Sequence, residues 1–162
     1  MTTIVTIEKR VCINPCFLGR KLKSQLFHFL KEITKNECTK ENGYIIEIIK
    51  INRIMNNYIS GNNCEIIFEV EIDTKVLKPE INKIFTDKVC MIFSGGIFVD
   101  VKNKFKVLIP LAYLYNLVFD QEKKHFKNEN TGFIIKENDV IDVKITGIKY
   151  SKNNFSCFGE LI

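Results

Sequence analysis

The 162-residue sequence lacks most of the patterns that mark metal sites, nucleotide-binding loops and membrane spans. Its six cysteines include no C-x-x-C pair, and two histidines are too few to complete a zinc site. No stretch approaches the roughly 18 consecutive apolar residues that a membrane-spanning helix requires. The pair Gly95-Gly96 is not followed by the Gly-Lys-Ser/Thr ending of a phosphate-binding loop. We therefore expect no metal, no cofactor and no membrane span.

Patterns typical of catalysis and secretion are also missing. His28 is expected on the polar side of a helix and His125 in a charged loop, and neither has a cysteine or carboxylate at a spacing typical of a general base. We therefore expect no enzyme activity. The first ten residues lack a basic start followed by a long apolar run, which argues against a signal peptide. The cysteines are accordingly expected to be reduced intracellular thiols.

The charge of the chain is mild and evenly spread. The 24 Lys and Arg residues exceed the 19 Asp and Glu residues by five. Residues 1–80 hold 12 basic and 10 acidic side chains, and residues 81–162 hold 12 and 9, so neither half is a basic arm. This excludes a strongly basic DNA binder and predicts that any nucleic-acid affinity is modest and falls with salt. With 46% hydrophobic residues and 13 Phe, the chain is expected to form a globular core.

The first half of the sequence predicts a helix on a small antiparallel sheet. Apolar residues alternate in some segments, as in half-buried strands, and recur every three or four residues in another, as on one face of a helix. Lys78-Pro79 marks a seam, because proline removes a strand hydrogen bond and favours extended geometry before it. The expected elements are a strand over 5–13, a helix over 18–33, a strand over 44–51, a polar loop over 53–64 and a strand over 66–73.

The second half predicts a small barrel. Five short alternating segments are separated by turns, with an insertion after the third that holds a short helical turn over 111–117 and a charged loop over 120–131. This order is typical of the OB-fold, a five-stranded Greek-key barrel. The expected fold class is therefore α+β, with domains over 1–79 and 80–162. The expected barrel strands cover 89–93, 97–101, 105–109, 140–150 and 155–161.

Several segments in this order resemble a known family. A strand that ends at Pro15 is followed by Gly19, and the seam at Lys78-Pro79 precedes the barrel. The matching segments are residues 11–21, 43–45, 68–70 with 76–79, 96–99 and 139–145. Together they resemble the stalk subunit of eukaryotic RNA polymerase II and its counterpart in the archaeal RNA polymerase, the E prime protein. The resemblance covers almost the whole chain.

The resemblance implies a fold, a function and partners. Members of this family pair an N-terminal tip domain with a C-terminal OB-fold, and they serve as non-catalytic subunits of a DNA-directed RNA polymerase. The implied partners are the polymerase core, through its largest subunits and the clamp base, and the emerging single-stranded RNA transcript. The resemblance leaves open whether a small helical second subunit completes the stalk. The implied location is the nucleus for a cellular source, or a virion or cytoplasmic factory for a viral one. The heavy use of Lys, Asn and Ile suggests an AT-rich genome, as in a large DNA virus or an intracellular parasite.

The resemblance also implies the residues that dock on the polymerase. They lie in the corner over 14–19 and in the expected loop over 53–64. A loop that contacts nothing gains no stability from exposing apolar side chains, so apolar residues there favour a docking role. The alternative is that these side chains fold back on the sheet of their own domain. The docking candidates are Pro15, Phe17, Gly19, Ile54, Met55, Ile59 and Gly61.

Candidate RNA-binding residues lie in the second half. Phe98 is expected on the face opposite Ile97 and Val99, where it would stack on bases, and core packing is the alternative. Phe93 is expected in the core. Lysines that alternate with other residues would track the phosphates, and their alternative role is the ordinary solubilising surface. These lysine candidates are Lys102, Lys104, Lys106, Lys144 and Lys149, of which the first three are expected to project together from one strand.

The sequence therefore supports two alternative functions. The first is the polymerase stalk subunit. The second is a free-standing OB-fold RNA-binding protein of translation or RNA processing, whose first half serves another interaction. A stalk subunit should co-purify with the large polymerase subunits in fixed ratio, and a free factor should not.

Overall fold

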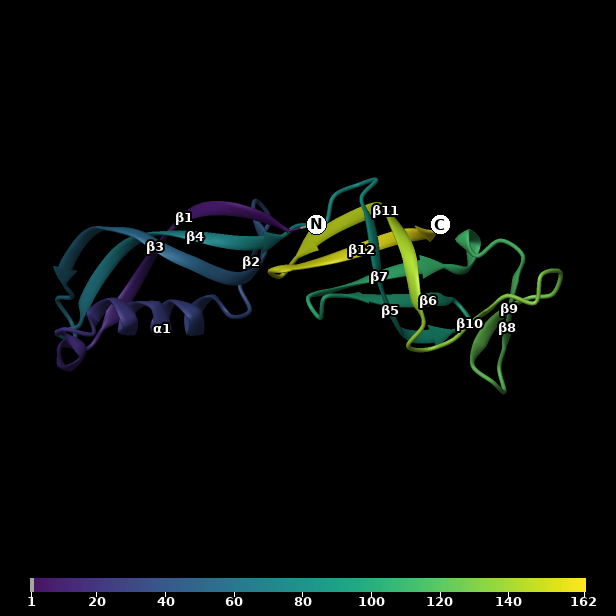
Figure 1. Cartoon of the computed structure of the whole chain (residues 1–162), viewed down its shortest axis with the longest axis horizontal. Coiled ribbons are helices and arrows are strands. Elements are labelled where there is room, and N and C mark those ends of the chain that lie inside the picture. The colour runs from purple at the N-terminus through teal and green to yellow at the C-terminus, as the bar shows by residue number, and fades with distance from the viewer. Residues whose placement is uncertain (1) are drawn as a thin grey trace. The chain divides into compact units, whose positions relative to one another are not determined.

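The computed structural model describes residues 2–162, and the chain forms two compact units, the first ending at Lys78 and the second covering Pro79–Ile162. The described residues are mostly β: twelve strands accompany one α-helix and two short 3-10 turns (Figure 1). The chain is thus richer in strand than the expected α+β class. Within residues 2–162 no helix is long and apolar enough to cross a membrane.

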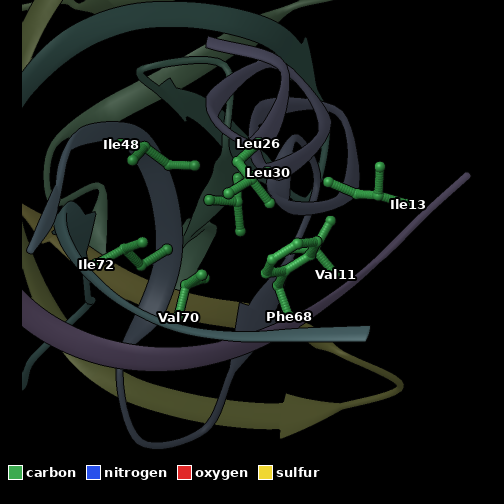
Figure 2. Close-up of a cluster of buried hydrophobic side chains, with 8 residues drawn as sticks. All are labelled: Val11, Ile13, Leu26, Leu30, Ile48, Phe68, Val70 and Ile72. Carbon is green, nitrogen blue, oxygen red and sulfur yellow. The ribbon is translucent and has the colours of Figure 1, made fainter. Parts of the chain in front are cut away.

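The first unit is a four-stranded antiparallel sheet with a helix on one face. Its strands are β1 (Thr3–Ile13), β2 (Cys38–Thr39), β3 (Gly43–Ile59) and β4 (Ile66–Leu77), in the order β1-β4-β3-β2. The helix α1 (Leu22–Thr34) turns Leu26 and Leu30 toward the sheet (Figure 2). The buried core of the unit consists of Val11, Ile13, Leu26, Leu30, Ile48, Phe68, Val70 and Ile72.

The helix begins later than the sequence predicted. Residues Pro15–Phe17 form the 3-10 turn η1, and the Asn14 side chain accepts a hydrogen bond from the backbone N–H of Cys16 at 3.1 Å. Leu18, the residue after this turn, has extended backbone angles, φ −70° and ψ 132°, so the helix does not begin there. The apolar spacing from Leu18 onward therefore overestimated the helix by one turn at its start.

The predicted loop over 53–64 is wrong, because β3 continues to Ile59. The register between β3 and β4 shifts four times, after Ile45, Ile48, Ile51 and Ile54. Each shift is a bulge that inserts one extra residue into β3. The core-facing isoleucines of β3 therefore recur every third residue, and a search for two-residue alternation misses the second half of the strand.

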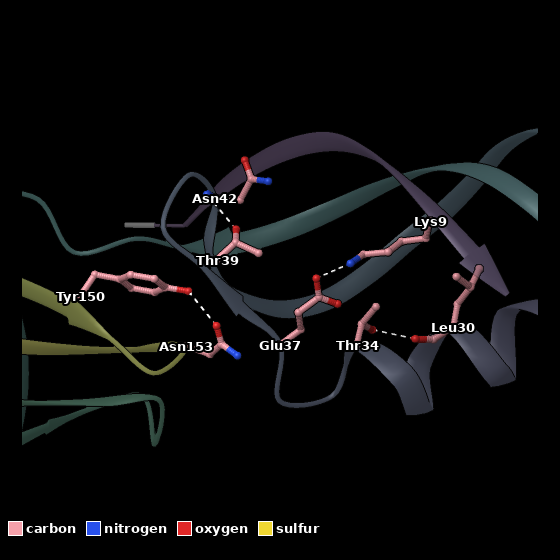
Figure 3. Close-up of polar contacts among 8 residues, drawn as sticks. All are labelled: Lys9, Leu30, Thr34, Glu37, Thr39, Asn42, Tyr150 and Asn153. Atoms are coloured by element: carbon pink, nitrogen blue, oxygen red, sulfur yellow. Dashed lines mark hydrogen bonds and ion pairs between the residues drawn. The ribbon is translucent and has the colours of Figure 1, made fainter.

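A few polar contacts secure the ends of these elements (Figure 3). Thr34 donates from Oγ1 to the Leu30 carbonyl at 2.7 Å at the end of α1, and Lys9 of β1 forms an ion pair with Glu37 just beyond it. The backbone N–H of Asn42 donates to Thr39 Oγ1 at 3.1 Å in the turn between β2 and β3. In the second unit, the Tyr150 hydroxyl donates to Asn153 Oδ1 at 3.2 Å across the turn before the last strand.

The second unit contains a closed five-stranded barrel, which confirms the predicted barrel. Its strands follow the order β11-β12-β7-β6-β5, and a parallel pairing of β12 with β7 closes it. Gly96 is needed where β6 begins, because a Cβ there would lie 2.2 Å from the Ile109 carbonyl oxygen. Burial in the barrel raises the pKa of the Cys157 thiol to about 12. The strands are β5 (Ile84–Phe93), β6 (Gly96–Val101), β7 (Phe105–Pro110), β11 (Val140–Ser151) and β12 (Asn154–Leu161).

An insertion between β7 and β11 forms a second small sheet. It contains the 3-10 turn η2 (Leu111–Tyr113) and the strands β8 (Leu117–Asp120), β9 (His125–Asn128) and β10 (Ile134–Ile135), in the order β10-β9-β8. The predicted charged loop over 120–131 is therefore wrong. It contains β9, whose Phe126 is fully buried. Strands of two to four residues are too short for an apolar rhythm to appear in the sequence.

Candidate nucleic-acid interface

Four apolar side chains form a row across the outer face of the barrel. The registers pair Met91 of β5 with Phe98 of β6, Phe98 with Leu108 of β7, and Leu108 with Phe158 of β12. Their chain neighbours, such as Ile97 and Val107, are buried inside the barrel, so the row faces outward. Met91 is 48% exposed and Phe158 45%, while Phe98 and Leu108 are half-buried. We call these four residues the apolar row.

A row of polar and charged residues runs beside the apolar row. It lies two residues along β6, β7 and β12 from the apolar row, about 7 Å away, and three residues along β5, where the bulge adds one. The registers pair Lys88 with Asp100, Asp100 with Lys106, and Lys149 with Ser156. These five residues, Lys88, Asp100, Lys106, Ser156 and Lys149, are named the charged row. Within residues 2–162 none of its three lysines is ion-paired.

A groove of about 340 Å³ is lined by members of both rows. Phe98, Leu108 and Phe158 provide its apolar wall, and Lys104 and Lys106 provide positive charge beside it. Aromatic faces next to lysines are the combination that holds stacked bases and their phosphates in proteins that bind single strands. This part of the barrel therefore has the chemistry of a nucleic-acid interface.

Phe98 lies on the predicted outer face, where its ring stacks on that of Phe93 with a centroid separation of 5.6 Å and an interplanar angle of 20°. Phe93 itself is half-buried and does not lie in the barrel core, contrary to the prediction. The reason is a register shift between Val89 and Met91. This bulge reverses the alternation, so Val89 points inward and Met91 points outward.

The predicted lysines do not form one set. Lys102 and Lys104 lie in the turn between β6 and β7, and only Lys106 belongs to the strand, so the expectation that the three project from one strand is wrong. Lys102 has a φ of +50°, which is typical of a tight hairpin turn. Lys149 lies in the charged row, whereas Lys144 forms an ion pair with Glu160 at 2.9 Å.

The sequence reading missed part of this face. Phe158, Leu108, Met91 and Lys88 were not singled out, although they share the two rows with Phe98 and Lys106. The alternation in β12, which buries Phe155 and Cys157, already places Phe158 outside. The cross-strand registers that bring the four strands together leave no such local signal.

The docking candidates gather at one end of the first unit, with two exceptions. The registers place Ile13, Ile66 and Ile59 opposite one another, so the corner over 14–19 and the loop over 60–65 extend from the same end of the sheet. Pro15, Gly19 and Gly61 are exposed there, with Phe17 at 42% and Ile59 at 71% exposure. Leu18 and Tyr58 add two further exposed apolar side chains.

The exceptions are Ile54 and Met55, which lie within β3 and not in a loop. Ile54 packs against the core of the first unit, as the alternative interpretation held. Met55 lines a shallow groove with Arg10 and Glu69. Both were misplaced because the bulges of β3 concealed the strand from the sequence.

The outer face of the first-unit sheet carries charges that are compensated. The Thr6 hydroxyl and the Asn52 amide, each at 2.7 Å, hold the pKa of the Asp73 carboxyl below its ordinary value. Four ion pairs cross the face: Arg10–Glu69 at 3.0 Å, Arg53–Glu71 at 3.3 Å, Lys75–Glu47 at 3.5 Å and Lys50–Asp73 at 3.7 Å. This face is therefore a poorer phosphate-binding surface than the barrel.

Comparison with known proteins gives two kinds of similarity. Residues 78–157 match the family model described as the S1 RNA binding domain. The chain is 18% identical over 163 residues to the DNA-directed RNA polymerase II subunit RPB7 of Glycine max, an alignment that covers 97% of this chain and 90% of that protein. It is 24% identical over 96 residues to the DNA-directed RNA polymerase II subunit 7 of Arabidopsis thaliana, covering 59% of this chain and 54% of that protein.

Among solved structures, the chain is 27% identical to RNase R of Mycoplasma genitalium, in its apo form and in complex with ribose methylated single-stranded RNA. These matches cover 51% of this chain and 13% of RNase R, with TM-scores of 0.42 and 0.44. The segment that matches the S1 model includes all of β5, β6, β7 and β11 and the first part of β12. The chain thus combines an S1-type barrel with distant similarity, along nearly its whole length, to a subunit of RNA polymerase II.

Proposed function

We propose that this protein is a non-catalytic stalk subunit of a DNA-directed RNA polymerase. In this proposal the first unit docks on the core near the clamp, and the barrel binds the emerging single-stranded RNA. The observation that carries the RNA part is the apolar row beside the lysines on a barrel that matches the S1 RNA binding domain. The similarity over 97% of the chain to an RNA polymerase II subunit supports the assembly part. For a cellular eukaryotic source this implies a nuclear location.

The end of the first unit supports the proposed docking role. Phe17, Leu18, Tyr58 and Ile59 are large apolar side chains that are all exposed at this end. The Phe17 ring is held by an edge contact with Phe29 of α1, at a centroid separation of 5.5 Å. Clustered exposed apolar side chains are typical of a protein–protein interface.

The charges and rings of the barrel support a sequence-tolerant mode of RNA binding. Bases would stack on Phe98 and Phe158 while Lys88, Lys106 and Lys149 contact phosphates. Neither contact reads the edge of a base, so affinity would depend on strand length and salt more than on sequence.

Affinity purification from the native source tests the docking proposal. The tagged wild-type protein should recover the two largest polymerase subunits at a ratio near one to one. Replacing Phe17 and Ile59 with aspartate should reduce that recovery about tenfold or more, because buried apolar anchors dominate interface energy. Ile4→Asp is the matched control, since Ile4 is 68% exposed at the opposite end of β1. Recovery of the wild type alone, or with ribosomal or processing factors, would instead favour the free-standing RNA-binding protein.

Salt dependence tests the role of the charged row. Changing Lys88, Lys106 and Lys149 together to alanine should reduce the slope of log K against log salt by about 2, at about 0.7 for each phosphate contact with a single strand. The measurement is fluorescence anisotropy with a labelled oligouridylate over a range of salt concentrations. The control removes three exposed lysines of the first unit, Lys21, Lys23 and Lys40, and so makes the same change in net charge. Equal slopes for both triple variants would contradict the assignment.

A further inference from the structure

A second groove, of about 490 Å³, lies between the hairpin of β5 and β6 and the insertion. Met91, Phe93 and Phe119 contribute apolar surface to it, and Gln121, Lys124 and Glu137 contribute polar groups. All these residues belong to the second unit. The groove therefore combines an apolar floor with a cation, an amide and a carboxylate.

The insertion holds its side of this groove in place. Phe119 contacts the fully buried Phe126 at a centroid separation of 5.3 Å, which anchors β8 and β9. The Asp120 side chain accepts from the backbone N–H groups of Glu122 at 2.9 Å and of Lys123 at 3.1 Å. These bonds fix the backbone of the turn that carries Gln121 and Lys124, so the two residues leave the chain beside the groove.

The groove begins where the apolar row ends. Met91 is a member of the apolar row and also lines the groove, and Phe93 stacks on Phe98. A strand whose base lies on Phe98 therefore has its next apolar surface at Met91 and Phe93. The next nucleotide of the same RNA strand then reaches Phe119 and the polar groups of the insertion.

The polar groups suit one nucleotide of a particular kind. The Lys124 ammonium is complementary to a phosphate, and the apolar floor accepts the face of a base. The Glu137 carboxylate only accepts hydrogen bonds when ionised, so it favours a base edge that carries an amino group. The Gln121 amide both donates and accepts. The carbonyl O4 of uracil would instead face the carboxylate.

We infer that this groove binds one further nucleotide of the RNA held by the apolar row, and that it prefers cytosine or adenine to uracil. The inference rests on the proposed RNA binding by the barrel, and it adds a position of base preference to an otherwise sequence-tolerant surface. Lys124 contacts the phosphate, and Gln121 and Glu137 contact the exocyclic amino group of the base.

The test uses the full chain and the shortest oligouridylate that binds with full affinity. A short oligonucleotide limits the number of positions at which the RNA can lie on the protein. A single cytosine is placed at each position in turn, and binding is measured by fluorescence anisotropy. One position should bind about fivefold or more tightly with cytosine than with uracil, the usual discrimination of a good base-edge contact. The double change Gln121→Ala and Glu137→Ala should abolish this preference.

Lys124→Ala should reduce the salt slope by about 0.7, as expected for one lost phosphate contact. Lys123→Ala is the matched control, because Lys123 is the adjacent exposed lysine of the same turn and does not line the groove. Binding that is weakened by Phe98→Ala but shows no cytosine preference, with equal slopes for the two lysine variants, would overturn the inference alone. No binding of any oligonucleotide by the wild type would overturn the proposed RNA function as well.

Discussion

Phe98→Ala and Phe158→Ala are each expected to weaken the binding of single-stranded RNA by about 1 to 3 kcal/mol, the range measured for a base stacked on an aromatic ring. Both rings lie in the apolar row and line the groove beside Lys104 and Lys106. Alanine removes the stacking surface but leaves the lysines, so the salt slope should stay close to that of the wild type. Affinity and slope are measured together by anisotropy titrations at several salt concentrations.

Phe133→Ala is the matched control for these two variants. Phe133 is 54% exposed in the insertion and lies outside both rows, so its loss should change affinity by less than about twofold, as for a surface position without a specific contact. Thermal unfolding of each variant must show an intact barrel, because Phe98 also stacks on Phe93. Two folded variants that bind as tightly as Phe133→Ala would exclude the apolar row as the site of base stacking.

The barrel was predictable from the sequence because its strands follow simple rules. β6 alternates between buried Ile97, Val99 and Val101 and outward residues, so both the strand and the outer position of Phe98 follow from a two-residue period. The expected strands over 97–101 and 105–109 likewise leave residues 102–104 for the turn that joins them, although the lysine spacing suggested a strand there. Where the local pattern and the tertiary structure agree in this way, the strands and their outward positions can be predicted from the sequence.

The failures within strands have one physical origin, which is departure from a regular strand. Bulges gave β3 a three-residue period and reversed the phase of β5 at Met91, and the strands of the insertion are too short to show any period. The candidate interface adds a second difficulty. Phe98, Leu108 and Phe158 are neighbours only through strand register, and register is a property of the folded barrel that no single segment of sequence carries.

The two proposed sites differ in what positions them. The apolar row is fixed by the closed barrel, whose strands pair on both sides. The docking end instead depends on how β1 terminates, because the corner over 14–19 follows Ile13 directly. Val11 and Ile13 are buried in the core that includes Leu26 and Leu30 of α1. The stability of this core therefore governs how well the docking side chains are presented.

Leu26→Ala is accordingly expected to lower the free energy of unfolding of the first unit by about 2 to 5 kcal/mol, the cost of a large-to-small change in a well-packed core. Leu26 is fully buried in the core between α1 and the sheet, so its loss leaves a cavity that the helix cannot easily fill. Amide hydrogen exchange of β1 and β4 measures the effect directly, because these strands carry the core. Recovery of the polymerase subunits should fall under conditions in which exchange shows the first unit of the variant to be partly unfolded, since only the folded unit presents Phe17 and Ile59 together.

Ile33→Ala separates burial from a general effect on the helix. Ile33 belongs to the same helix but is 51% exposed, so its replacement should change stability by less than about 0.5 kcal/mol and leave polymerase recovery unchanged. Equal exchange rates for the two variants would mean that α1 does not support the sheet. Undiminished recovery of a Leu26→Ala variant whose first unit hydrogen exchange shows to be unfolded would mean that docking does not require the folded core, and the corner over 14–19 would then have to bind as an extended segment.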